Sequence, residues 1–325
     1  MAERAPDRAA TPFPFFLGCG RSGTTLVRVM FDAHPQLAIP PGTGLAKHMG
    51  ERHAQYEVGG GIDVDRFERD VLASDRFSIW GLDEATVHRA LHDPAPATVA
   101  DAVRRVYAAY AASHGKPRYA NKSHGYVLSI PVVAALLPEA RFVHIVRDGR
   151  NVALSLIDSP FGPNNVAAGA RFWRRRVERG RFDGHRLGPG RYREVAYEAV
   201  VADPEAVLTD LCAFLELPFD PAMLRYYEQP EHVSRGLKHP DIHKNLIRPP
   251  TPNVRDWRDQ MSGQDVARFE AIAGSSLERF GYERAVPVPL ARKLEERFRT
   301  SVRSARHRAS RVRRADPALK GSRHA

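Results

Sequence analysis

Cysteine is scarce in this sequence: the 325 residues include only two, Cys19 and Cys212. Their spacing fits neither a disulfide framework nor a cysteine-based metal motif. Cys19 lies in a glycine-rich segment, and Cys212 lies on the apolar face of a predicted helix. We therefore expect two small buried thiols and no zinc or iron site.

Long hydrophobic runs are also missing. No apolar stretch approaches the roughly 18 residues that a membrane-spanning helix needs. Residues 1–16 carry charges of both signs followed by a short apolar run, which is unlike a secretion signal. The hydrophobic content of 43% is enough for a sizeable core. These features predict a globular protein with a cytoplasmic location.

Acidic residues are depleted in one segment, the C-terminal tail. Residues 285–325 contain three Asp or Glu against twelve Lys or Arg, so the tail holds +9 of the net charge of +11. Because the remaining charge is nearly balanced, we expect no nucleic-acid partner. Leu290, Leu294 and Phe298 recur every four residues, so the tail is either a basic amphipathic helix or a solvated terminus. A weak contact with an anionic membrane or another polyanion is the interaction that such a tail allows.

A phosphate-binding loop without its usual lysine occupies the segment FFLGCGRSGTTLVRVM, residues 15–30. Gly18 and Gly23 have the spacing of the loop G-x-x-x-x-G-K-[ST], and Thr25 occupies its final position. Thr24 stands where the loop normally has lysine, and Arg21 lies inside the loop instead. The segment therefore predicts a site for a phosphate-like anion that does not use a loop lysine.

Apolar runs and helical periodicities alternate along the chain. This pattern predicts an α/β fold of the P-loop NTPase-like kind, a mostly parallel sheet with helices on both faces. No linker is strong enough to divide the core, so we expect an N-terminal extension (1–12), one domain (13–284) and the basic tail (285–325). The predicted strands are 15–17, 36–39, 118–122, 140–148 and 191–198. The predicted helices are 24–31, one through 99–110, 130–137, 151–157 and one from 204 to 215, with a mostly helical region over 42–96.

Polar side chains follow several of these strands. In sheets of this kind, ligands bind beyond the carboxyl ends of the strands. The loop follows the first strand, and the residues that follow or end the later strands are Lys122, Ser123, His124, Arg147, Asp148, Arg150 and Tyr197. We expect these groups to converge on one rim of the sheet.

Two segments resemble one enzyme family. RSGTTLVRVMFDAHP (21–35) and VRDGRNVALSL (146–156) are similar to sulfotransferases that use the nucleotide sulfate donor PAPS, especially the tyrosylprotein sulfotransferases and their bacterial relatives. The resemblance covers about half the chain. It implies a 5′-phosphosulfate loop made by Arg21, Ser22, Gly23, Thr24 and Thr25. It further implies a 3′-phosphate site at Arg147 and Ser155, with Tyr197 contacting the nucleotide.

The tetrapeptide NKSH, residues 121–124, resembles the family's catalytic segment. The resemblance implies that Lys122 meets the bridging oxygen of the leaving group and that His124 is the general base. One position departs from the family pattern, because Gly42 stands where tyrosylprotein and many bacterial sulfotransferases have a catalytic glutamate. His48, Glu51 and His53 lie nearby in sequence.

Sulfuryl chemistry accounts for the missing lysine. A sulfuryl group carries less negative charge than a γ-phosphoryl group, for which kinases use Mg²⁺ and the loop lysine. Backbone N–H groups and the helix N-terminus, with Arg21, can hold the smaller charge. No Walker B aspartate is evident either, so we expect no metal at the site. The planar guanidinium of Arg147 would donate hydrogen bonds to two oxygens of the 3′-phosphate, a group that ATP lacks.

The sequence therefore predicts metal-free, in-line sulfuryl transfer from PAPS, with PAP as the product nucleotide. The acceptor group is a hydroxyl, with an amine as the second choice. The acceptor molecule stays open among small molecules, carbohydrates, lipids and peptides. The alternative is a non-catalytic nucleotide- or phosphate-binding protein of the same fold. A metal-dependent kinase is disfavoured by Thr24.

Overall fold

The computed structural model describes residues 11–287, apart from 43, 75, 161, 229–232, 234–245 and 252–255. Residues Met1–Tyr282 form one compact unit, and Glu283–Ala325 form a second. The expected extension (1–12) and basic tail (285–325) fall almost wholly outside the described residues, so their boundaries stay predictions.

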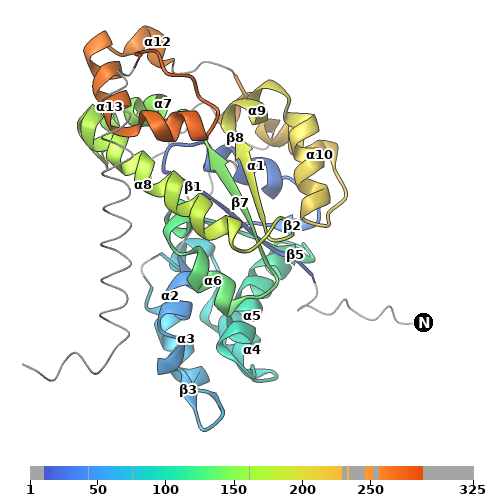
Figure 1. The fold of residues 1–325 in the computed structure, drawn as a ribbon. Helices are drawn as coiled ribbons and strands as arrows, with labels where there is room; N and C mark the ends of the chain where they lie inside the picture. Colours follow the sequence, from blue (N-terminus) through green and yellow to red (C-terminus); the bar gives the residue numbers. More distant parts are fainter. Residues whose placement is uncertain are drawn as a thin grey trace, which may run out of the picture. The chain divides into compact units, whose positions relative to one another are not determined.

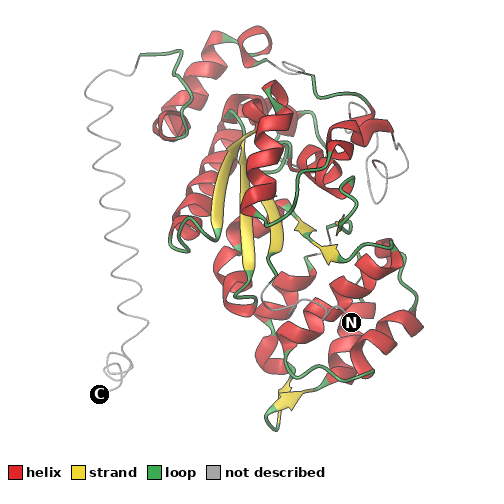
Figure 2. Ribbon diagram, turned by 90° about the vertical axis from the view of Figure 1, so that its right-hand side faces the viewer, coloured by secondary structure: helices red, strands yellow, loops and turns green. Residues whose placement is uncertain are grey.

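A four-stranded parallel sheet forms the centre of the first unit (Figure 2). Its order is β6 (Asn121–Lys122), β1 (Phe13–Gly18), β7 (Ala140–Val146) and β8 (Tyr192–Ala196). Every residue of β1 is buried, as expected for a central strand of a parallel sheet. The predicted α/β fold with a mostly parallel sheet is thus confirmed.

Helices cover both faces of this sheet because successive strand residues point to opposite sides. Phe16, from β1, packs in a core with α1 (Thr24–Asp32), α9 (Tyr197–Ala202) and α10 (Pro204–Phe214). Its neighbour Phe15 belongs to the core on the opposite face. A third apolar cluster joins α7 (Gly149–Ile157), α8 (Val166–His185) and α13 (Gly263–Arg279). The helices predicted at 24–31, 151–157 and 204–215 are therefore present.

A helical layer lies below the sheet in Figure 1 and is formed by α2 to α6. These helices are α2 (Leu45–Glu51), α3 (Val64–Leu72), α4 (Glu84–His92), α5 (Val99–Ser113) and α6 (Ile130–Leu136). Side chains of Asp63, Asp83 and Thr98 cap α3, α4 and α5 by accepting backbone N–H groups. A short hairpin of β3 (Glu57–Val58) and β4 (Gly61–Ile62) precedes α3. The mostly helical prediction for 42–96 is confirmed.

Two features differ from the prediction. The expected strand 118–122 is divided: β5 (Arg118–Tyr119) pairs with β2 (Leu37–Ala38), and β6 pairs with β1. The chain changes partner at Ala120, whose N–H donates to the carbonyl of Ala38 at 2.9 Å. The 20-residue helix α8 was not predicted at all. Its glycines weaken the helical pattern, yet Gly184 is required because a Cβ there would lie 2.1 Å from the ring of Tyr192.

The remaining described elements are short. They are the 3₁₀ helices His53–Gln55, Ser78–Trp80, His124–Leu128 and Pro221–Glu228, and α12 (Trp257–Gln260). Within the described ranges, no helix has the length and apolar character to cross a bilayer. Cys19 and Cys212 are free and buried as expected, and burial raises the pKa of both thiols to about 12.

Candidate active site

The glycine-rich loop makes a tight turn between β1 and α1. Gly18 permits this turn to lie against β7, since a Cβ there would lie 2.4 Å from the carbonyl oxygen of Ile145. Arg21 and Gly23 both have left-handed backbone conformations, with φ of 72° and 86°. The N–H of Ser22 donates to the carbonyl of Cys19 at 3.1 Å and closes the turn. The loop therefore has the compact form that its glycine spacing predicts.

The N-terminus of α1 has the character of an anion site. Its N-cap, Gly23, offers no side chain to the first backbone N–H groups, and the first turn contains no acidic residue. These N–H groups have no partner inside the helix, and they lie at the positive end of its dipole. The Ser22 hydroxyl is buried and has no hydrogen-bond partner among the described residues. These N–H groups and the Ser22 hydroxyl are therefore suited to binding a phosphate or sulfate group.

A pocket opens beside this helix end and encloses about 660 Å³, part of it solvent. Six predicted donor-site residues line it: Arg21, Gly23, Thr24, Thr25, Arg147 and Tyr197. Five lining residues were not predicted: Leu26, Tyr226, Leu246, Pro250 and Thr251. The residues that follow β1, β7 and β8 therefore meet at this pocket, as expected.

Arg147 lines the same pocket as the N-terminus of α1. Its guanidinium carbon lies 4.5 Å from the ring centroid of Tyr197, within cation–π range. One terminal nitrogen donates to the carbonyl of Arg21 at 3.4 Å. Its Nε is buried without a hydrogen-bond partner in the described part of the chain. Arg147 therefore keeps donor capacity that an anionic ligand can use.

Ser155 lies next to this group but is absent from the pocket lining. It is buried on α7, and its hydroxyl oxygen accepts a hydrogen bond from Nε of Arg21 at 2.9 Å. Ser155 therefore fixes the side chain of Arg21. Its own hydroxyl proton remains available to a phosphate oxygen, so the contact predicted for it stays a prediction.

Lys122 and His124 lie on the other side of the loop. Sheet order places β6 beside β1, opposite to β7. The ring of His124 is close to the loop backbone, because a Cβ on Gly20 would lie 3.9 Å from its Cδ2 atom. Neither residue lines the pocket that contains Arg147. The loop thus separates this pocket from the predicted catalytic pair.

Several positive charges act on Lys122 and His124. Burial, followed by the charges of Arg28, Arg76 and Arg21, lowers the pKa of Lys122 to about 7. The ring of His124 is exposed on one side, but the protein packed around it, and then nearby Lys122, Arg176 and Arg76, lower its pKa to about 4. Positive charges with few local anions repel one another, so this region favours an anionic ligand.

Three of these arginines were not predicted as site residues. Arg28 is buried on α1 and lies 3.6 Å from the carboxylate of Asp32. Arg76 lies between α3 and α4, and Arg176 lies on α8. The segments that contain Arg76 and Arg176 carry no motif, so only the folded chain brings them to the loop.

Gly42 lies directly against the backbone of Lys122. A Cβ at this position would be 2.5 Å from the carbonyl oxygen of Lys122, closer than real Cβ contacts allow. The backbone therefore excludes a glutamate side chain here. Of the nearby candidates, Glu51 pairs with Lys47 at 3.6 Å, and the ring of His53 contacts the Gly50 carbonyl at 3.0 Å.

Gly42→Ala is expected to destabilise the protein, because its methyl group forces the backbone of Lys122 to move. Overpacking of this kind costs about 1–3 kcal/mol, so the melting temperature should fall by several degrees. Gly190→Ala is the matched control, since a Cβ there meets no atom within 4 Å. Thermal unfolding of both variants checks this, and an unchanged melting temperature for Gly42→Ala would contradict the contact.

Asp148 and Arg150, which the sequence also placed at the rim, have a structural role. The Arg150 guanidinium is buried, pairs with Asp148 and Glu270 at 2.7 Å each, and lies 3.7 Å from the ring centroid of Trp257. These contacts join α7 to α12 and α13. Arg150 therefore positions the C-terminal helices rather than a ligand.

Comparison with known proteins identifies relatives of the whole core. Residues 12–221 match the model of the sulfotransferase family. A protein-tyrosine sulfotransferase of Drosophila melanogaster is 25% identical over 283 residues, which cover 84% of this chain and 52% of that protein. Protein-tyrosine sulfotransferase A of Caenorhabditis elegans is 23% identical over 284 residues, covering 84% of this chain and 68% of that protein. The chain thus spans about half the length of the Drosophila relative.

A solved structure has the same architecture. The sulfotransferase domain of the Synechococcus PCC 7002 olefin synthase superimposes with a TM-score of 0.57 and 25% identity. The match covers 88% of this chain and 100% of that domain.

Proposed function

Since the chain belongs to the sulfotransferase family of enzymes, we propose that it transfers a sulfuryl group from PAPS to an acceptor hydroxyl. The observation that carries the choice of donor is the pocket that the N-terminus of α1 and Arg147 both line. The helix end offers backbone N–H groups without a side-chain cap, and Arg147 offers a guanidinium whose Nε is buried and has no hydrogen-bond partner among the described residues. Two sets of anion-binding groups in one pocket suit a nucleotide that carries a phosphosulfate and a separate 3′-phosphate.

The pocket residues divide between the two ends of this donor. The loop from Ser22 to Thr25 would hold the 5′-phosphosulfate, and Arg147 would hold the 3′-phosphate. Tyr226 and Leu246 line the same pocket and give it an apolar wall suited to a purine ring.

Lys122 and His124 lie on the other side of the loop and would act on the transferred group there. His124 would take the proton of the acceptor hydroxyl while its oxygen forms a bond to sulfur. Lys122 would stabilise the negative charge on the phosphate oxygen as the old sulfur–oxygen bond breaks. PAP and the sulfated acceptor are then the products. The lowered pKa of His124 leaves the ring neutral at pH 7, which is the form that accepts a proton.

The names of the relatives favour a phenolic hydroxyl as the acceptor. Several are protein-tyrosine sulfotransferases, so we propose that a tyrosine side chain of a peptide or protein is the acceptor of this chain as well. A screen with labelled PAPS, in which tyrosine peptides compete with carbohydrates, lipids, small phenols and amines, tests this proposal. Label in a non-peptide acceptor alone would overturn the choice of acceptor but not that of the donor.

The alternative of a non-catalytic nucleotide-binding protein rests on the missing glutamate at Gly42. PAP binding without transfer of label to any acceptor would favour this alternative. Turnover without added metal would support the proposed reaction and agree with the expectation from the loop.

Arg147→Gln is expected to weaken PAP binding roughly ten- to a hundredfold, because a charge-assisted contact to the 3′-phosphate contributes about 1.5–3 kcal/mol. AMP, which has no 3′-phosphate, should bind equally to the variant and the original protein. Calorimetry with both nucleotides measures the difference.

Arg171→Gln is a suitable control, since Arg171 is exposed on α8 and absent from the pocket lining. Equal affinity of the unmodified protein for PAP and AMP would refute the assignment of the donor.

A further inference from the structure

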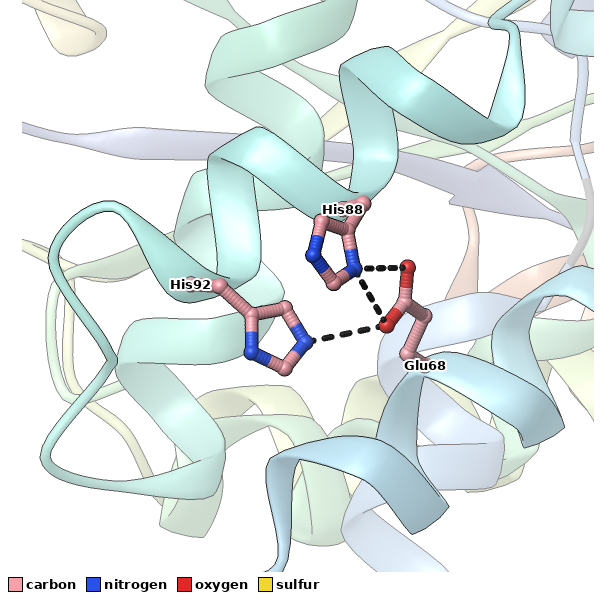
Figure 3. A group of neighbouring side chains, drawn as sticks. All are labelled: Glu68, His88 and His92. Carbon is pink, nitrogen blue, oxygen red and sulfur yellow. Dashed lines mark hydrogen bonds and ion pairs between the residues drawn. The ribbon is translucent and has the colours of Figure 1, made fainter.

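A cluster of potential metal ligands lies in the helical layer, on elements that contribute nothing to the pocket lining. Glu68 comes from α3, and His88 and His92 come from α4 (Figure 3). Nδ1 of His88 lies 3.2 Å from both carboxylate oxygens of Glu68. Nε2 of His92 lies 2.9 Å from Oε2 of the same carboxylate. One carboxylate therefore faces two imidazole nitrogens.

The arrangement has the geometry of a transition-metal site. The three ligand atoms all lie within 4.8 Å of one another. A tetrahedral zinc ion with bonds of about 2.1 Å separates its ligand atoms by about 3.4 Å, close to the distances between Glu68 and the two rings. His88 and His92 are one helical turn apart, so both rings lie on the same face of α4. Their ring centroids are 4.1 Å apart, with the planes 23° from parallel.

We propose that Glu68, His88 and His92 bind a divalent transition metal, with Zn²⁺ as the best fit. Two imidazoles and one carboxylate are ligands that this ion prefers. Asp65 lies one turn before Glu68 on α3, and its Oδ1 is 3.8 Å from Nε2 of His92. Asp65 or a water molecule completes the four ligands. The scarcity of cysteine has no bearing on this site, since it uses none.

The metal would join α3 to α4. The side chains of Glu68 and His92 are 13% and 27% exposed, whereas His88 is 62% exposed, so the site opens to solvent on the His88 side. The segment between the two helices contains Arg76, whose charge acts on Lys122 and His124. A metal that fixes both helices therefore stabilises the segment that carries this cation.

Titration of the full chain with Zn²⁺ by calorimetry tests the proposal, with Co²⁺ as a spectroscopic probe. We expect one strong site, and visible absorption of Co²⁺ with the intensity of tetrahedral coordination. The double variant His88→Ala/His92→Ala should bind Zn²⁺ roughly tenfold more weakly or worse, a loss of about 1.4 kcal/mol or more. Glu68→Gln keeps the shape of the side chain, so it tests the ligand role if the double variant does not fold.

His185→Ala is the matched control. His185 is an exposed histidine whose Nε2 lies 4.0 Å from a carboxylate oxygen of Glu194, but that carboxylate already pairs with Arg181. This variant should bind Zn²⁺ and Co²⁺ like the original protein. The proposal is overturned if the original chain binds no Zn²⁺, or if Glu68→Gln and the double variant bind it undiminished.

Discussion

His124→Ala is expected to lower kcat about a hundredfold or more on a proven acceptor, because a positioned general base contributes typically 10²- to 10⁴-fold. The ring lies beside the phosphate loop, next to Gly20, but outside the pocket that contains Arg147. PAP affinity should stay within a few fold of the original value, because the proposed role of His124 is toward the acceptor hydroxyl and not toward PAP. The measurement is steady-state turnover of labelled PAPS together with PAP binding by calorimetry.

A pH profile separates a base from a residue that only maintains the structure. The protein packed around the partly exposed ring, and then the nearby cations, lower the pKa of His124 to about 4 in the free protein. Negative charge from a bound donor offsets those cations, so the pKa in the complex should be higher. Because the neutral ring is the active form, kcat should fall as the pH drops through that value. The residual kcat of His124→Ala should not show this decrease at low pH.

Normal turnover by His124→Ala would assign the base to another group. The next candidates are His48, Glu51 and His53, on α2 and the turn after it. Gly42 itself would remain excluded, since the carbonyl of Lys122 occupies the space of its side chain.

Lys122→Met is expected to impair both donor binding and turnover. Its ammonium would contact the leaving oxygen, so PAP affinity should fall roughly ten- to a hundredfold, and kcat should fall as well because the departing charge loses its partner. Lys122→Arg retains the charge and is the matched control for binding. Calorimetry and turnover measured on the same preparations test both effects, and unchanged PAP affinity in Lys122→Met would remove Lys122 from the donor site.

Donor binding should also depend on pH through Lys122. Burial and three arginines lower its pKa to about 7 in the free protein, and an anionic nucleotide favours the protonated form and raises the pKa in the complex. Above pH 7, binding must then take up a proton. PAP affinity should fall as the pH rises, by at most tenfold per unit. Lys122→Arg, which stays charged, should lack this slope, and a flat profile for the original protein would contradict the assignment.

The sheet was predictable because a parallel strand buried on both faces is an almost continuous apolar run. Residues 13–18 and 140–146 are of this kind, and both form central strands. The division at Ala120 was not predictable, since residues on both sides of it have strand character and only their partners differ. Helix α8 was missed for a related reason: Gly180 and Gly184 weaken its pattern, but the fold needs them for close approach to β7 and β8.

The candidate site was predictable where a local motif encodes it. Gly18 to Thr25 form a loop whose spacing is visible in the sequence, and Arg147 and Tyr197 follow strands that the sequence reveals. Arg76 and Arg176 come from helical regions without a motif, and their importance arises only when folding brings their charge to Lys122 and His124. The cluster of Glu68, His88 and His92 likewise depends on the packing of α3 against α4, since Glu68 and His88 are 20 residues apart in the sequence.

The left-handed backbone of Arg21 implies a compromise between folding and recognition. A residue with a side chain at φ near +70° lowers the stability of the fold by about 1 kcal/mol or more relative to glycine, which adopts this conformation freely. Glycine at position 21 would therefore give a more stable loop, but it would remove the guanidinium that Ser155 holds in place. The chain keeps a strained residue where a relaxed one would fold better. Replacing Arg21 by glycine to stabilise the loop would thus remove the positive charge that Ser155 holds in place.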